Sequence, residues 1–150
     1  MGRRTKAREC ALQMLYQWDM TQETMDRVTG LFWKVRTTTD ATREMAERLA
    51  RGAQQNLERI DAAITKASTN WRFERIAGVD RNILRVGAYE LMMERQTPSS
   101  VIIDEAVEMA KRFSEADSPA FVNGVLDAVK RAVRDEDTAA SRPRRKGERS

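Results

Sequence analysis

Residues 44–64 read EMAERLARGAQQNLERIDAAI, and the apolar side chains of this stretch recur every three or four positions. They are Met45, Leu49, Ala53, Leu57, Ile60 and Ile64. This spacing places side chains on one face of an α-helix, whereas a strand would alternate at every second residue. Thr37–Thr39 and then Asp40 precede the stretch and supply the side-chain oxygens that cap a helix start. The pattern predicts one long helix from about residue 40 to residue 64.

The same period continues on both sides of this stretch. Working outward, it predicts helices over residues 6–20, 25–35, 80–92, 99–113 and 118–133, with a short hydrophobic turn at 71–76. We expect Asp80 to cap the helix that follows it, and Ser118 to cap the last helix, with Pro119 at its first position. Short links favour antiparallel packing of neighbouring helices. The expected class is all-α, a compact bundle of about seven helices in two packed subdomains.

Composition narrows the possible functions. The chain has 150 residues, with one cysteine and no histidine. These counts exclude a disulfide framework within the chain, an ordinary zinc site and catalysis by a histidine base. We therefore expect a protein that is not an enzyme and needs no metal or cofactor. No apolar run approaches the roughly 20 residues of a membrane-spanning helix, and no signal-peptide core is present, so we expect a cytoplasmic location.

Positive charge is concentrated at the two ends of the chain, although the net charge is only +4. Arg3, Arg4, Lys6 and Arg8 precede the first acidic residue, and five cations lie within the last nine residues. Residues 135–150 hold no large apolar side chain that would offset the entropy lost on ordering. We expect them to form a disordered basic tail after a folded domain that spans residues 1–134.

The basic start is a candidate binding site. Cations on the first turn of a helix, with the unpaired amides there, attract phosphate groups. Single-stranded RNA is held by such a basic path together with aromatic rings on which its bases stack. Phe121 is a candidate ring, and the nearby Asn123 amide can both donate and accept hydrogen bonds. On spacing alone, Phe121 and Phe113 can equally belong to the core.

Three stretches of the sequence also resemble one known family, in the family's order. They are residues 4–18 (RTKARECALQMLYQW), 80–90 (DRNILRVGAYE) and 103–127, which contains IDEAVE and FVNGVLD. These stretches resemble the NusB family of transcription antitermination factors, and the likeness extends to about residue 134. The resemblance implies an all-helical RNA-binding protein that pairs with the ribosomal protein NusE, holds boxA RNA and joins an antitermination complex on RNA polymerase during ribosomal RNA synthesis.

The charge pattern and the resemblance together give a set of expected site residues. The expected RNA-binding residues are Arg3, Arg4, Lys6, Arg8, Phe113, Asp117, Phe121 and Asn123, and those expected to face NusE are Tyr16 and Asp80. Two alternatives remain open: a NusB-like accessory domain of an RNA cytosine methyltransferase, and a helical adaptor with no RNA role. The sequence is compatible with either a monomer or a homodimer.

Overall fold

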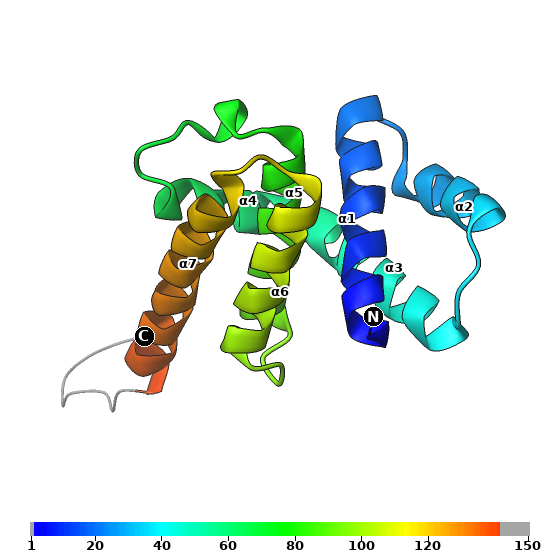
Figure 1. Cartoon of the computed structure of the whole chain (residues 1–150). Coiled ribbons are helices and arrows are strands. Elements are labelled where there is room, and N and C mark those ends of the chain that lie inside the picture. Colours follow the sequence, from blue (N-terminus) through cyan, green and yellow to red (C-terminus); the bar gives the residue numbers. More distant parts are fainter. Residues whose placement is uncertain (1, 142–150) are drawn as a thin grey trace.

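The computed structural model describes residues 2–141, and within that range it contains seven α-helices, one 3-10 turn and no strand (Figure 1). The elements are α1 (Arg3–Thr21), α2 (Met25–Val35), α3 (Asp40–Gln55), α4 (Leu57–Ala67), the 3-10 turn η1 (Phe73–Arg75), α5 (Gly78–Met93), α6 (Ser99–Phe113) and α7 (Ser118–Ser141). The all-α prediction is confirmed. None of these helices is both long enough and apolar enough to cross a lipid bilayer.

Helix α5 lies at the centre of the bundle and contacts α1, α3, α4, α6 and α7. Every residue from Asn82 to Leu91 is buried. Helix α1 also packs on α2 and α3, while α7 packs on α4 and α6. Helices α1–α3 therefore form one group and α4–α7 a second, and α1 and α3 of the first group pack against α5 of the second (Figure 1). This arrangement agrees with the two packed subdomains expected from the sequence. A helix buried on all sides must pair any charge it carries, and α5 does so with residues of α1 and α4.

The expected single helix over residues 40–64 is wrong in one respect, because the chain bends at Asn56 and forms two helices, α3 and α4. The Asn56 backbone has φ of −110° and ψ of 23°, and its side-chain amide donates to the Gly52 carbonyl at 2.8 Å. Gly52 itself approaches α5 so closely that an added Cβ atom would lie 2.4 Å from the Tyr89 ring. The bend lets α3 pack against α1 while α4 packs against α5 and α7.

Only one of the expected helix caps has the expected role. The Thr39 hydroxyl accepts a hydrogen bond from the Thr42 N–H at 3.2 Å, as the Thr-rich link predicts. Asp80 does not cap α5, because the helix begins at Gly78 and Asp80 is buried within its first turn. Ser118 is the first residue of α7 rather than its cap, and its hydroxyl donates to the Asp80 carboxylate.

Helix α7 extends past residue 134 to Ser141, the last residue that the structure describes. The prediction of disorder is therefore wrong for residues 135–141. Alanine and charged residues continue a helix readily without apolar burial, and an ion pair between Asp137 and Arg95 joins this part of α7 to the loop after α5. The rest of the expected tail, residues 142–150, lies outside the described residues.

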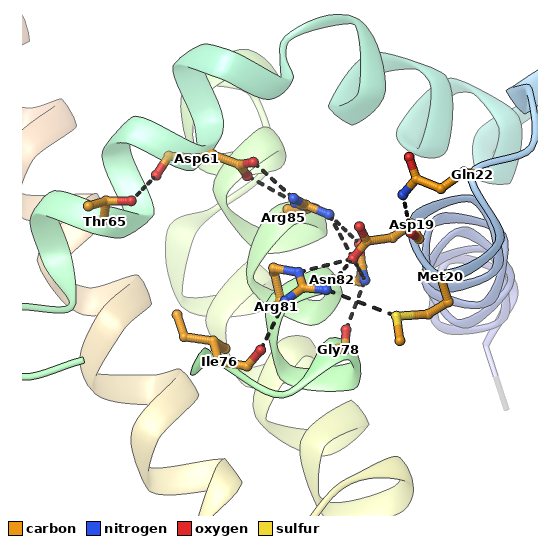
Figure 2. A network of polar contacts seen from close by, with 10 residues as sticks. All are labelled: Asp19, Met20, Gln22, Asp61, Thr65, Ile76, Gly78, Arg81, Asn82 and Arg85. Atoms are coloured by element: carbon orange, nitrogen blue, oxygen red, sulfur yellow. Dashed lines mark hydrogen bonds and ion pairs between the residues drawn. The ribbon is translucent and has the colours of Figure 1, made fainter. Parts of the chain in front are cut away.

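A polar network joins α5 to α1 and α4 (Figure 2). The Arg85 guanidinium makes two 2.9 Å hydrogen bonds to Asp61 on α4 and lies 3.1 Å from Asp19 Oδ2 on α1. Arg81 and Asn82 donate to the same Asp19 oxygen at 2.7 and 3.0 Å. Burial raises the pKa of Asp19, but these hydrogen bonds and the two positive charges outweigh burial and hold the pKa below its ordinary value.

Substituting Asp19→Asn should lower the free energy of unfolding by about 1–3 kcal/mol at neutral pH, because Arg81 and Arg85 lose a charged acceptor. The folded-state pKa of Asp19 is depressed, so its stabilisation is present above the unfolded pKa of about 4 and is lost as the pH falls through the folded value. Urea titrations at neutral pH and at successively lower pH measure the free energy of unfolding. The difference in this free energy between wild type and variant should shrink as the pH falls. The control is Asp104→Asn, a substitution at an exposed residue of α6. If the difference in unfolding free energy between wild type and Asp19→Asn does not change with pH, this role of the Asp19 carboxylate is contradicted.

Candidate nucleic-acid interface

The first turn of α1 presents three exposed cations, Arg3, Arg4 and Lys6. The first amides of a helix have no carbonyl partner within it, so the positive end of the helix dipole adds to these side chains. Arg3 and Arg4 also line a groove together with Arg48 of α3 and the loop after α5. Arg48 is paired with Glu94 at 2.8 Å, whereas Arg3 and Arg4 face the groove without an ion-pair partner among the described residues. The groove therefore suits an anionic ligand such as phosphate.

Arg8 differs from the other cations of the basic start, because its side chain is only 2% exposed. Its guanidinium makes two hydrogen bonds to Glu90 on α5, at 2.8 and 2.9 Å, and lies 4.0 Å from Glu105 on α6. Burial lowers the pKa of Arg8, but the paired Glu90 carboxylate outweighs burial and keeps the pKa above its ordinary value. The prediction that Arg8 contacts RNA is wrong, because its charge is neutralised inside the protein.

Phe113 is the last residue of α6, and its ring is 38% exposed. The Arg112 guanidinium lies 5.3 Å from the centre of this ring and also pairs with Glu9 on α1. Of the two roles that the spacing left open, core packing and surface contact, the structure places Phe113 at the surface. An exposed ring beside a guanidinium plane is the kind of surface on which an unpaired base stacks.

Phe121 lies in the first turn of α7 and is half-buried, with part of its ring packed against the core. Its exposed part lines a hollow together with Asp117, in the turn just before α7, and with Trp71 and Arg75 of the loop between α4 and α5. Asn123 is exposed but does not line this hollow, because two residues correspond to about 200° around a helix. Asp117 and Phe121 thus line the same hollow, whereas Asn123, which is near Phe121 in the sequence, does not.

Asp80 was expected to face NusE, but its side chain is buried and its carboxylate is already occupied. The hydroxyls of Ser114 and Ser118 donate to its two oxygens at 2.5 and 2.9 Å. These bonds hold the turn between α6 and α7, which contains Asp117 and is flanked by Phe113 at the end of α6 and by Phe121 in the first turn of α7. Asp80 therefore positions the candidate RNA-binding residues and does not present a free charge to a partner.

The basic start and the aromatic residues are linked along α6. The Thr5 hydroxyl donates to Glu105 at 2.8 Å, and Glu9, one turn further along α1, pairs with Arg112, two turns further along α6. The two helices therefore run side by side in the same direction (Figure 1). Phe113 lies eight residues beyond Glu105, which corresponds to about 12 Å of helix rise. A single nucleic-acid strand that follows α6 can therefore contact both the cations at the start of α1 and the aromatic residues at the end of α6.

A second feature is an apolar groove between α1 and α2, with a volume of about 790 Å³. Its large exposed apolar side chains are Tyr16, Met20, Leu31, Val35 and Phe113. Clustered exposed apolar side chains are typical of a protein-binding surface. Tyr16, which the resemblance expects to face NusE, lines this groove. The sequence pattern did not single out Leu31 and Val35, because apolar spacing along the helix predicted over residues 25–35 does not distinguish exposed from buried positions.

Comparisons with known proteins identify the family of the chain. The sequence profile of the NusB family matches residues 5–131. Two curated relatives are the transcription antitermination proteins NusB of Sorangium cellulosum, 48% identical over 129 residues (86% of this chain and 92% of the relative), and of Trichlorobacter lovleyi, 45% identical over 137 residues (91% and 96%).

Solved structures of NusB proteins have a similar fold. T. maritima NusB superposes with a TM-score of 0.80 at 31% identity, covering 93% of this chain and 98% of that one. A chain from a crystal structure of antitermination factors NusB and NusE in complex with double-stranded RNA superposes with a TM-score of 0.81 at 28% identity, covering 88% and 98%. From its profile match, its relatives and its fold, the chain belongs to the NusB family.

Proposed function

We propose that this protein is a transcription antitermination factor that binds boxA RNA together with NusE, in the cytoplasm, and that it acts by binding and not by catalysis. The observation that carries the proposal is the exposed cationic turn of Arg3, Arg4 and Lys6 at the start of α1. The solved complex of a NusB, NusE and RNA supports the choice of partners.

In this proposal the RNA strand lies along the edge of the molecule that connects the start of α1 to the turn between α6 and α7. Arg3, Arg4 and Lys6 contact phosphates and supply affinity that depends little on sequence. Phe113 and Phe121 offer rings to unpaired bases at the other end of the path, where stacking contributes about 1–3 kcal/mol per base. Asp117 lies at the rim of the same hollow, where a carboxylate can accept hydrogen bonds from base amino groups.

NusE is proposed to cover the apolar groove between α1 and α2. This groove holds five of the large apolar side chains that the described residues leave exposed, and Phe113 belongs both to it and to the proposed RNA path. A partner seated in the groove would therefore lie next to the bound strand. This proximity gives a physical reason for the two ligands to bind more tightly together than separately, because each can contact the other.

The two alternatives left open by the sequence are less well supported. The NusB proteins of S. cellulosum and T. lovleyi are matched over 92% and 96% of their own length, and both are antitermination proteins, not domains of a methyltransferase. A helical adaptor without an RNA role offers no reason for three exposed cations on one helix turn that have no ion-pair partner within residues 2–141.

Replacing Arg3, Arg4 and Lys6 together by Ala should weaken binding of single-stranded boxA RNA. It should also reduce the slope of log K against log salt by about 2, since each phosphate contact contributes about 0.7 on a single strand. Filter-binding titrations over a range of salt concentrations measure both quantities. The matched control replaces three exposed cations elsewhere, Arg27, Arg59 and Arg131, and removes the same net charge. An equal fall in slope for both variants would mean that the RNA has no defined path.

Arg8→Ala should act on stability and not on RNA binding. The substitution leaves the buried Glu90 carboxylate without its partner and should cost about 3–5 kcal/mol. Thermal unfolding measures the loss, and the fraction that remains folded should bind boxA RNA with the wild-type salt slope. A reduced slope with unchanged stability would instead mean that Arg8 leaves Glu90 to contact phosphate.

Val35→Asp should weaken binding of NusE by roughly tenfold or more, because it places a charge in an apolar contact. Val35 is 82% exposed, so the free protein should keep its melting temperature within a few degrees. Val101→Asp, at an exposed apolar position of α6 outside the groove, is the control. Calorimetric titration with NusE distinguishes the two variants, and equal affinities would exclude the groove as the binding site.

A further inference from the structure

The loop between α4 and α5 presents Trp71, which is 56% exposed, more than any other aromatic side chain among the described residues. The loop is held firmly on both sides of this ring. The backbone N–H of Trp71 donates to the Ser68 carbonyl at 3.1 Å, and the buried Ser68 hydroxyl donates to the Ile64 carbonyl of α4 at 2.7 Å. Phe73 packs against the core beneath the Arg85 guanidinium, and Ile76 is buried. An apolar ring kept in water by a well-anchored loop is available to a ligand without much loss of conformational entropy.

Trp71 and Phe121 form an aromatic corner. Their ring centres are 5.9 Å apart and their planes meet at 66°, so one ring stands edge-on to the other. The hollow beside them has a volume of about 260 Å³ and is bounded by Ile76, Asp117 and Ser118, among others. It is smaller than the roughly 300–1,000 Å³ of pockets that hold drug-sized ligands. A hollow of this size with two aromatic walls suits a single flat ring system.

The charges around the corner are unevenly distributed. Arg72 and Arg75 belong to the loop between α4 and α5. Neither has a side-chain ion-pair partner in the part of the chain that the structure describes. Together with Asn70 and Trp71 they line a second hollow, so Trp71 and Arg75 border both hollows. The first hollow is also lined by three carboxylates, Glu115, Asp117 and the hydrogen-bonded Asp80, whereas the second hollow has none. This arrangement favours an occupant whose anionic part lies in the second hollow by the arginines and whose neutral part, with hydrogen-bond donors at its edge, faces the carboxylates of the first.

We propose that the corner formed by Trp71 and Phe121 stacks one unpaired base of the bound RNA, and that Arg72 and Arg75 contact the phosphates that flank this base. The proposal rests on the proposed function and extends the RNA path onto the loop between α4 and α5. Aromatic planes beside guanidinium groups are the usual means of holding single-stranded RNA. A protein segment would satisfy the rings but would leave the two arginines without a charged partner, so the observations favour RNA.

The first test uses intrinsic fluorescence. The chain has three tryptophans, at positions 18, 33 and 71, and Trp18 and Trp33 are mostly shielded. Addition of single-stranded boxA RNA should quench the emission of the wild-type protein, and Trp71→Phe should abolish that quenching while the RNA remains bound. A variant that combines Trp18→Phe with Trp33→Phe, in which Trp71 alone emits, should show a larger fractional quench. Bound RNA with unchanged Trp71 emission would overturn the proposal.

The second test uses affinity and its salt dependence. Trp71→Ala should weaken binding of the same RNA about 5- to 150-fold and leave the salt slope unchanged, because stacking carries no charge. Trp71→Phe should recover most of the affinity. The double substitution Arg72→Ala with Arg75→Ala should instead reduce the slope by about 1.4, as expected for two phosphates on a single strand. Circular dichroism melting verifies that each variant is folded.

The outcomes separate this proposal from the proposed function. If the Arg3, Arg4 and Lys6 substitutions abolish RNA binding but Trp71→Ala leaves it unchanged, the protein binds RNA without this corner and the proposal is wrong. If Trp71→Ala weakens binding of NusE and not of RNA, the corner holds a protein, which also overturns the proposal. If the wild-type protein binds no RNA at all, the proposed function itself fails, and this inference fails with it.

Discussion

The ion pair between Arg8 and Glu90 is the constraint on which the position of the basic start depends. Both side chains are buried, and a buried charge is tolerated only where an opposite charge and hydrogen bonds compensate its lost hydration. Arg8 can meet Glu90 only if α1 lies on α5 in one register. Arg4, one turn earlier on the same face, then lies beyond the core and borders the groove that Glu90 also lines. One internal pair thus orients the cations that stay in water.

Polar contacts of the same kind fix the other parts of the candidate site. Asp80 accepts hydrogen bonds from both ends of the turn between α6 and α7, and Glu105 joins α6 to the first turns of α1. Apolar packing alone would allow helices to slide or rotate by a fraction of a turn, because dispersion is not directional. These paired charges and hydroxyls specify a single arrangement of the two ends of the site, which come from parts of the chain about 100 residues apart.

Much of the fold could be predicted from the sequence, because apolar spacing reports directly on which helix face is buried. What the spacing does not report is where a helix bends or what a charged residue contacts. The bend at Asn56 preserves the apolar period across α3 and α4, and the partner of Arg8 lies 82 positions away. Asp80 looked like a cap, and Trp71 looked like part of a hydrophobic turn. In each case the side chain has the expected chemistry, and only the three-dimensional neighbours decide its role.

The close contact between α3 and α5 also constrains how sequences of this fold can vary. The Tyr89 ring occupies the space that any side chain at position 52 would need, and both groups are enclosed by the rest of the bundle. The two positions therefore share one volume. Over evolutionary time, an alanine or serine in place of Gly52 becomes tolerable only where position 89 has first shrunk, so the pair should change in a fixed order and covary.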